Sequence, residues 1–137
     1  MMDLTDARDF LAAHGRAVMH TTRADGGPQL SPVVATVDDA GRAIVSTRAT
    51  SVKVRNLERD PATSLCVFTD QFFGPWVRID GIAHIVRLPE AMDLLIDYYR
   101  RVAGEHDDWD DYRRAMDEER RVLLRIDIEE VGPNVAG

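Results

Sequence analysis

The sequence predicts a mostly β protein, a six-stranded antiparallel barrel with peripheral helices. Six segments have the apolar alternation and β-branched residues of strands, and hairpin-type turns at residues 24–27 and 38–41 join the first three of them. Strands in this meander-like order can close on themselves, and closure removes exposed edges. The length of 137 residues suits one domain, so we expect residues 1–137 to form a single barrel domain.

The N-terminal third predicts a helix followed by three strands. The helix covers residues 4–14, with Thr5 as its N-cap and Gly15 at its end. The first strand covers residues 16–23, and the turn after it contains Asp25 and Gly26, a pair that tolerates the positive φ angles of tight hairpins. The second strand covers residues 28–38 and the third covers residues 42–48. Two successive hairpins predict an antiparallel meander.

Residues 44–61, IVSTRATSVKVRNLERDP, combine the end of the third strand, a polar turn and a short basic helix. The helix contains Lys53, the only lysine among the 17 basic residues of the chain. Free backbone N–H groups at a helix N-terminus, the helix dipole and nearby cations together hold an anion such as phosphate. The pattern also fits a surface connector whose arginines pair with Glu58 and Asp60, so the residues alone leave both interpretations open.

The C-terminal half predicts three more strands and two helices. Strands cover residues 63–70 and 76–87, and Gly81 interrupts the alternation of the second one, which is typical of a β-bulge or a sharp bend. Pro89 is expected to open a helix that Gly104 ends. Residues 108–120 predict a second amphipathic helix, and residues 121–130 have the clearest strand alternation in the chain.

Composition and charge exclude several classes of protein. A net charge of -7 argues against a nucleic-acid binder or a protein of anionic membrane surfaces, because these need an excess of cations. Cys66, the only cysteine, lies in an apolar run and is expected to be a buried structural thiol. The N-terminus is acidic and has no long apolar segment, so we expect neither a signal peptide nor a membrane span, and a cytoplasmic location by default.

Standard catalytic and metal motifs are absent from the sequence. The four histidines have no ligand-like spacing, and an acidic helix start explains the acids around His106, so we expect no metal site. No nucleophile elbow, dinucleotide fingerprint or P-loop occurs. The remaining candidate is the strand-to-helix turn before Lys53, which suits the phosphate of a bound cofactor.

Three blocks of sequence carry a resemblance to a known family. They are GGPQLSPV at residues 26–33, KVRNLERDP at residues 53–61, and YYRRVAGEHDDWDDYRRAMDEERRVLLRI at residues 98–126. Together they resemble the split β-barrel proteins related to pyridoxamine 5'-phosphate oxidase. The third block is similar to the subgroup that uses the deazaflavin coenzyme F-420 in place of a flavin. The resemblance implies an FMN-binding type of split barrel and a homodimer with two equivalent cofactor sites in clefts between the subunits.

The resemblance also implies which residues contact the cofactor. The phosphate would sit against the strand-to-helix turn, at Arg48, Thr50, Ser51, Lys53 and Arg55. The ring would lie along the second strand, beside Gln29, Leu30, Ser31 and Pro32, and the partner subunit would close the cleft with Trp76 or Trp109. The residues alone favour a simpler interpretation of two of these groups, in which Gln29 and Ser31 face solvent and Trp109 belongs to the core.

The function that the resemblance implies is an F-420-dependent reductase, in which the reduced cofactor gives a hydride to an unsaturated small molecule. The sequence identifies no catalytic residue, and we expect the proton to come from solvent first, with Ser31 and His106 as the side-chain candidates. Two alternatives remain. One is an FMN-dependent flavoprotein of the same fold, and the other is a non-catalytic protein that stores or delivers the deazaflavin.

Overall fold

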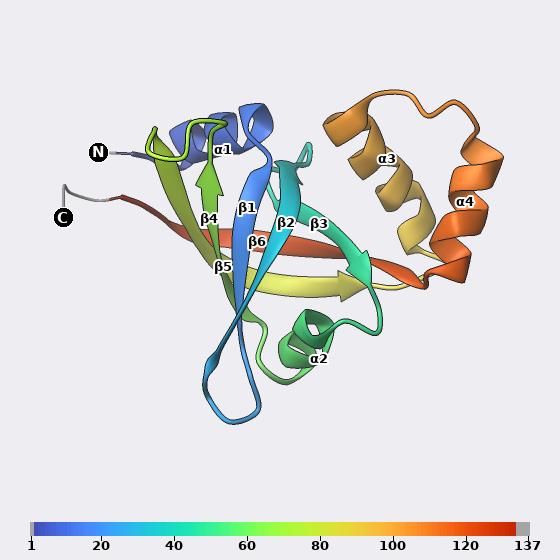
Figure 1. Ribbon diagram of the computed structural model, residues 1–137, viewed down its shortest axis with the longest axis horizontal. Helices are drawn as coiled ribbons and strands as arrows, with labels where there is room; N and C mark the ends of the chain where they lie inside the picture. The colour runs from blue at the N-terminus through green and yellow to red at the C-terminus, as the bar shows by residue number, and fades with distance from the viewer. Residues whose placement is uncertain (1, 134–137) are drawn as a thin grey trace.

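Six antiparallel strands close into a barrel in the computed structural model, which describes residues 2–133 (Figure 1). Around the barrel the order is β1-β2-β3-β6-β5-β4, so the predicted six-stranded antiparallel barrel is confirmed. The elements in chain order are α1 (Leu4–Ala13), β1 (Arg16–Thr22), β2 (Pro28–Val37), β3 (Ala43–Arg48), α2 (Val52–Arg59), β4 (Ala62–Phe68), β5 (Trp76–Val86), α3 (Ala91–Ala103), α4 (Trp109–Glu118) and β6 (Arg121–Gly132).

Both predicted hairpins form, and each has a glycine in the left-handed region. Gly26 has φ of 87° and its N–H donates to the carbonyl of Arg23, which closes the β1–β2 turn at 2.9 Å. Gly41 has φ of 78° in the β2–β3 turn. A side chain is strained at such angles, so these two positions favour glycine.

The barrel wall opens between β2 and β3. Strand β2 pairs with β1 from Pro28 to Val34, but it pairs with β3 only from Ala35 to Val37. Residues 28–34 therefore have no strand partner on their second side within the part of the chain that the structure describes. Strand β3 continues beside β6 as far as Arg48, so the two strands diverge and leave a gap in the wall.

Two apolar cores hold the molecule together. The first fills the barrel, where α1 adds Leu11 to interior residues such as Met19 and Leu124. The second lies outside the barrel, where α3 and α4 cover the outer face of β3 and β6 at Ile44 and Leu123. Figure 1 shows α3 and α4 together on one side of the barrel, while α1 and α2 lie near opposite ends of the strands. The second core therefore fixes α3 beside the gap between β2 and β3.

The Gly81 prediction is confirmed, because the β5–β6 register shifts between Asp80 and Gly81. A Cβ atom at Gly81 would overlap the carbonyl oxygen of Asp127 on β6, so the close approach of the two strands requires glycine. Cys66 is only partly buried, and burial raises the pKa of its thiol.

Two helix starts differ from their predictions. The N-cap of α1 is Asp3 rather than Thr5, because Asp3 and Asp6 exchange side-chain hydrogen bonds with each other's backbone N–H in a capping box. Helix α3 starts at Ala91 rather than at Pro89. The chain makes a turn first, in which the N–H of Ala91 donates to the carbonyl of Arg87 at 3.0 Å.

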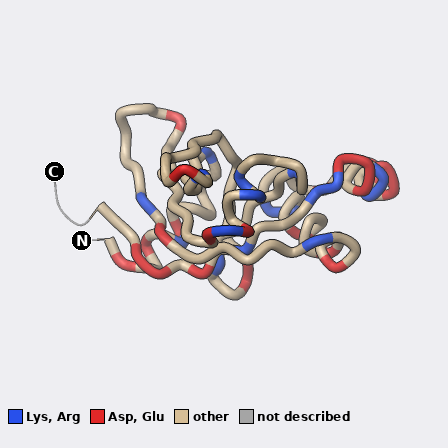
Figure 2. Tube along the Cα trace, turned by 90° about the horizontal axis from the view of Figure 1, so that it is seen from below, with Lys and Arg blue, Asp and Glu red and all other residues tan. Residues whose placement is uncertain are grey.

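Charged residues of both signs are interleaved along the chain, and α4 carries both (Figure 2). None of the helices described is both long and apolar enough to cross a membrane.

Candidate functional site

A cleft of about 700 Å³ opens where β2 and β3 diverge. One wall is apolar and contains Val18, Pro32, Val34 and Phe68. The other end is polar, and its side chains come from β3, α2, α3 and β6: Ser46, Thr47, Lys53, Tyr98 and Arg121. Arg16 of β1 also lines the cleft and pairs with Asp70 at 3.1 Å. The cleft thus has an apolar wall and a polar end that carries Lys53 and Arg121.

Helix α2 places Lys53 at the polar end. Its N-cap is Ser51, whose hydroxyl accepts a hydrogen bond from the N–H of Val54 at 3.4 Å. Five residues after Ser51, the buried amide of Asn56 donates to the hydroxyl of Thr21 on β1 at 3.0 Å. The helix is thereby fixed to the barrel at one face, and Lys53 lies on a part of α2 that faces the cleft.

The charged neighbour of Lys53 is Arg121 rather than a carboxylate. Burial lowers the pKa of Lys53, and the positive charge of Arg121 lowers it further. Across residues 2–133, Lys53 has no carboxylate within ion-pair distance. Arg121 instead pairs with Glu119, with its Nη2 at 2.8 Å from Oε1, and this hydrogen-bonded pair holds the pKa of Glu119 below its usual range. An anion entering the cleft would meet a lysine that no described carboxylate neutralises.

Tyr98 is a site residue that the sequence did not reveal. Its hydroxyl reaches from α3 and donates to the carbonyl of Val34 at 2.7 Å, on the stretch of β2 that has left β3. Burial raises the pKa of the phenol, so it stays protonated and keeps its role as a donor. The spacing of apolar residues places Tyr98 on the buried face of its helix, and no sequence signal distinguishes a core tyrosine from one that spans a gap.

The five residues predicted to hold the phosphate occupy different positions. Lys53 lines the cleft, and Ser51 caps the helix that carries it. Arg48 lies outside the cleft lining and contacts Glu119 at 3.5 Å. Thr50 and Arg55 are exposed and do not line the cleft. The structure thus brings only Lys53 of this group to the cleft wall, and it adds Arg121 from the distant strand β6.

The four residues predicted to lie beside the ring divide between two faces of β2. Ser31 is opposite Met19, a residue of the barrel interior, and Gln29 lies on the same side of the strand. Leu30 and Pro32 lie on the outer side, where Pro32 lines the cleft and Leu30 is 60% exposed. Alternation along a strand therefore separates residues that are neighbours in sequence. The hydroxyl of Ser31 is buried and has no hydrogen-bond partner within the described part of the chain.

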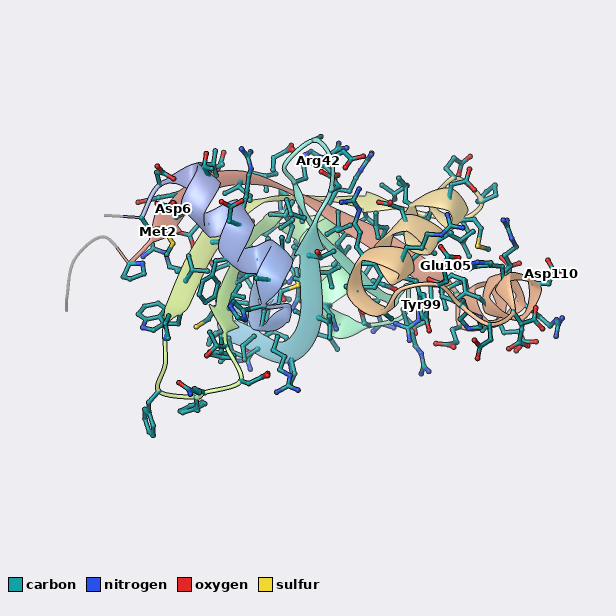
Figure 3. The ribbon with its side chains drawn as sticks, turned by 90° about the horizontal axis from the view of Figure 1, so that it is seen from above. Met2, Asp6, Arg42, Tyr99, Glu105 and Asp110 are labelled. Atoms are coloured by element: carbon teal, nitrogen blue, oxygen red, sulfur yellow. The ribbon has the colours of Figure 1, made fainter. Side chains whose placement is uncertain are left out.

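The two tryptophans lie in different parts of the molecule. Trp76 starts β5, is 47% exposed, and is opposite Phe68 of the cleft wall. Trp109 belongs to the α3–α4 hairpin, where its indole N–H donates to Glu105 at 3.1 Å and its ring packs edge-on against Tyr99. Figure 3 shows Tyr99 and Glu105 at this end of the molecule. Neither tryptophan is among the described residues that line the cleft.

His106 also lies in this aromatic cluster. Its Nδ1 accepts the N–H of Asp108 at 2.9 Å, and its ring packs 5.1 Å from that of Tyr99. The described residues contain no group of three or more histidine, cysteine or acidic side chains that could hold a metal ion.

The family model described as "Pyridoxamine 5'-phosphate oxidase" matches residues 5–134. Among solved structures, a conserved hypothetical protein from Mycobacterium tuberculosis is 26% identical with a TM-score of 0.78, and the alignment covers 100% of this chain and 94% of that one. An F-420 reductase is 19% identical with a TM-score of 0.71, covering 91% and 94% of the two chains. A heme storage protein from Vibrio cholerae is 18% identical with a TM-score of 0.70, covering 96% and 94%.

Proposed function

Because the chain belongs to the pyridoxamine 5'-phosphate oxidase family, we propose that it is an oxidoreductase that binds a flavin-like cofactor in the cleft between β2 and β3. Our specific proposal is a reductase that uses coenzyme F-420 and acts on an unsaturated small molecule. One observation carries the proposal: Lys53 and Arg121 form a cationic end to a cleft whose opposite wall is apolar. The F-420 reductase with the same fold supports the choice of cofactor.

The residues of the cleft fit a phosphorylated ring cofactor. Ligand pockets in proteins typically measure about 300 to 1,000 Å³, and this one measures about 700 Å³. Lys53 would hold the phosphate, and Arg121, fixed by Glu119, would add a second positive charge. The apolar wall formed by Val18 and Pro32 would flank the ring and exclude water from one side of it.

Bound reduced F-420 would supply a hydride from C5 of its ring to an electron-poor double bond, so the chain itself need not provide a nucleophile or a metal. The protein's part is to bind and orient the cofactor and to keep water from the reacting atoms. The lining of the cleft contains no carboxylate or imidazole side chain among the residues described. We therefore assign the proton delivered to the reduced substrate to solvent.

We further propose that the protein is a homodimer whose subunits close each other's clefts. Several large apolar side chains are exposed on one subunit, namely Leu30, Val34, Phe72, Phe73 and Trp76, with Phe73 at 98%. Leu30 and Val34 flank Pro32 of the cleft wall on the outer side of β2. Large apolar side chains that stay exposed commonly mark a protein interface where they gather. A partner seated there would cover the open side of the cofactor.

The test is a titration of the purified protein with oxidised F-420 and, in parallel, with FMN, followed by tryptophan fluorescence. Micromolar or tighter binding of F-420 with much weaker binding of FMN supports the proposal. Preference for FMN would make the protein a flavoprotein of the same fold. Binding of neither cofactor would contradict the proposed function.

A second candidate function is a non-catalytic deazaflavin carrier, and the absence of a carboxylate or imidazole side chain from the described cleft lining favours it. A turnover assay distinguishes the carrier from the reductase. The reductase is expected to oxidise reduced F-420 in the presence of some enone, quinone or tetrapyrrole, measured by the return of the oxidised cofactor's absorbance. Tight binding without turnover across the whole panel would favour the carrier.

A further inference from the structure

Lys53 is a primary amine in a setting that differs from that of an ordinary surface lysine. It is partly buried, lines a cleft of about 700 Å³, and has Arg121 rather than a carboxylate as its charged neighbour. We propose that Lys53 condenses with small anionic aldehydes, phosphorylated ones in particular, and forms a reversible imine with them when the cleft holds no cofactor. Because this imine would occupy the cofactor's phosphate position, the competition that it predicts rests on the proposed function.

The surroundings of Lys53 increase the fraction of the neutral amine relative to that of an ordinary lysine. Only the neutral amine attacks a carbonyl group, and an ordinary lysine is almost entirely in its charged ammonium form near neutral pH. At Lys53 burial and the charge of Arg121 both disfavour the ammonium ion, and they lower the pKa of the side chain. No carboxylate within the described residues offsets this effect by pairing with the amine.

The same cleft attracts the anionic part of the aldehyde. The guanidinium of Arg121 lines the polar end and is fixed there by Glu119, at 2.8 and 2.9 Å. A phosphate held by Arg121 would keep the aldehyde of the same molecule near Lys53. The hydroxyl of Ser46 lies in the same lining and can exchange protons with the reacting oxygen. Binding and reaction thus use different side chains of one cleft.

The reaction balances without an oxidant or a reductant. The lone pair of Nζ forms a bond to the carbonyl carbon, the carbonyl π bond breaks, and its oxygen takes a proton, which gives a carbinolamine. Loss of a proton from nitrogen and of the hydroxyl group with a second proton releases water and leaves a carbon–nitrogen double bond. Hydrolysis reverses these steps.

The chain has only one lysine, which makes the test sharp. The cofactor-free protein is incubated with pyridoxal 5'-phosphate, the imine is reduced with borohydride, and the modified residue is located by peptide mass spectrometry. The expected result is labelling at Lys53 and its loss in Lys53→Arg, while any label on the N-terminal amine stays unchanged and serves as an internal control. Pyridoxal without its phosphate is expected to label Lys53 more slowly, and Arg121→Gln is expected to remove this difference.

Two results would overturn the inference: labelling confined to the N-terminal amine, or labelling of Lys53 no faster than in an unfolded peptide of residues 48–58.

Labelling in the presence of bound cofactor separates the two proposals, because a cofactor in the cleft should protect Lys53 from the aldehyde. Failure of Lys53 to react in a protein that binds F-420 or FMN would refute the imine alone. Labelling of Lys53 that saturating F-420 and FMN leave unaffected would contradict the proposed cofactor position while supporting the amine chemistry.

Discussion

Lys53 is the only lysine in the sequence and lies at the polar end of the cleft. Removal of its ammonium group therefore tests the proposed phosphate site directly. We expect Lys53→Ala to weaken cofactor binding by roughly 1.5 to 3 kcal/mol, the usual range for a hydrogen bond to a charged group. The dissociation constant from a fluorescence titration measures this change. Arg113→Ala removes an exposed cation on α4, outside the cleft, and is the matched control. Equal dissociation constants for parent and Lys53→Ala would remove Lys53 from the site.

Cofactor affinity should depend on pH through the same group. Phosphate binding requires the ammonium form, and the pKa of Lys53 in the free protein lies below the ordinary 10.5 because of burial and Arg121. Affinity is therefore expected to be constant at lower pH and to fall as pH rises through this lowered pKa. Titrations at alkaline pH measure the decline. Lys53→Arg should remove it, because arginine stays charged throughout, and an identical decline in this variant would assign the effect to another group.

The hydroxyl of Tyr98 lies in the cleft lining and bonds α3 to β2 at Val34, the stretch of β2 that borders the cleft. Tyr98→Phe removes this single bond, so we expect weaker cofactor binding and an altered visible circular dichroism of the bound cofactor. The neighbouring Tyr99→Phe is the control, because the Tyr99 ring packs in the aromatic cluster around Trp109 and does not line the cleft. If Tyr98→Phe lowers thermal stability but leaves the cofactor spectrum and affinity unchanged, Tyr98 has a structural role only.

Sequence reasoning predicted the part of the candidate site that is local in the chain. Lys53 and Ser51 belong to one strand-to-helix turn, and the spacing of polar residues revealed it. Tyr98 and Arg121 could not be found in this way, because they meet Lys53 only after the barrel has closed. Ser31 was expected beside the same ring as Pro32, but strand alternation directs it to the other face.

At the scale of elements, one buried hydrogen bond joins α2 to β1. Asn56 donates to Thr21 at 3.0 Å, and both residues are buried. Asn56→Ala leaves the hydroxyl of Thr21 without this partner, and we expect a loss of about 1 to 3 kcal/mol in the free energy of unfolding. Chemical denaturation measures it. Arg55→Ala, on the exposed side of the same helix, should change stability by no more than about 0.5 kcal/mol, and an equal loss in both variants would contradict this role of Asn56.

The strands could be predicted because alternation of apolar residues is strong evidence for them, and Gly81 marked the bulge correctly. Helix starts were less predictable, since Asp3 and Thr5 are both good N-caps and only the capping box with Asp6 decides between them. The divergence of β2 from β3 has no sequence signal of its own. Helix α3, which an outer core holds in position, reaches β2 beside this divergence through Tyr98.

At the scale of the whole molecule, the proposed dimer should depend on the outer face of β2. Leu30→Glu places a charge on an apolar side chain that is 60% exposed, so we expect the dimer to dissociate while the barrel stays folded. Light scattering at micromolar concentration measures the mass, and circular dichroism checks the fold. Ala24→Glu adds the same charge at the β1–β2 turn and should leave the mass unchanged. A monomeric parent protein would contradict the dimer outright.

The opening in the barrel wall leaves a free strand edge, and such an edge invites a foreign strand to add to it and start aggregation. The carbonyl of Val34 points to this edge, because Tyr98 binds it there. Because backbone N–H and C=O groups alternate in direction along a strand, the backbone groups of Pro28, Leu30 and Pro32 point to the same edge. The two prolines have no N–H to offer, so half of these four positions cannot donate to an incoming chain. The protein can therefore keep its barrel open for a ligand without offering a template for amyloid-like growth.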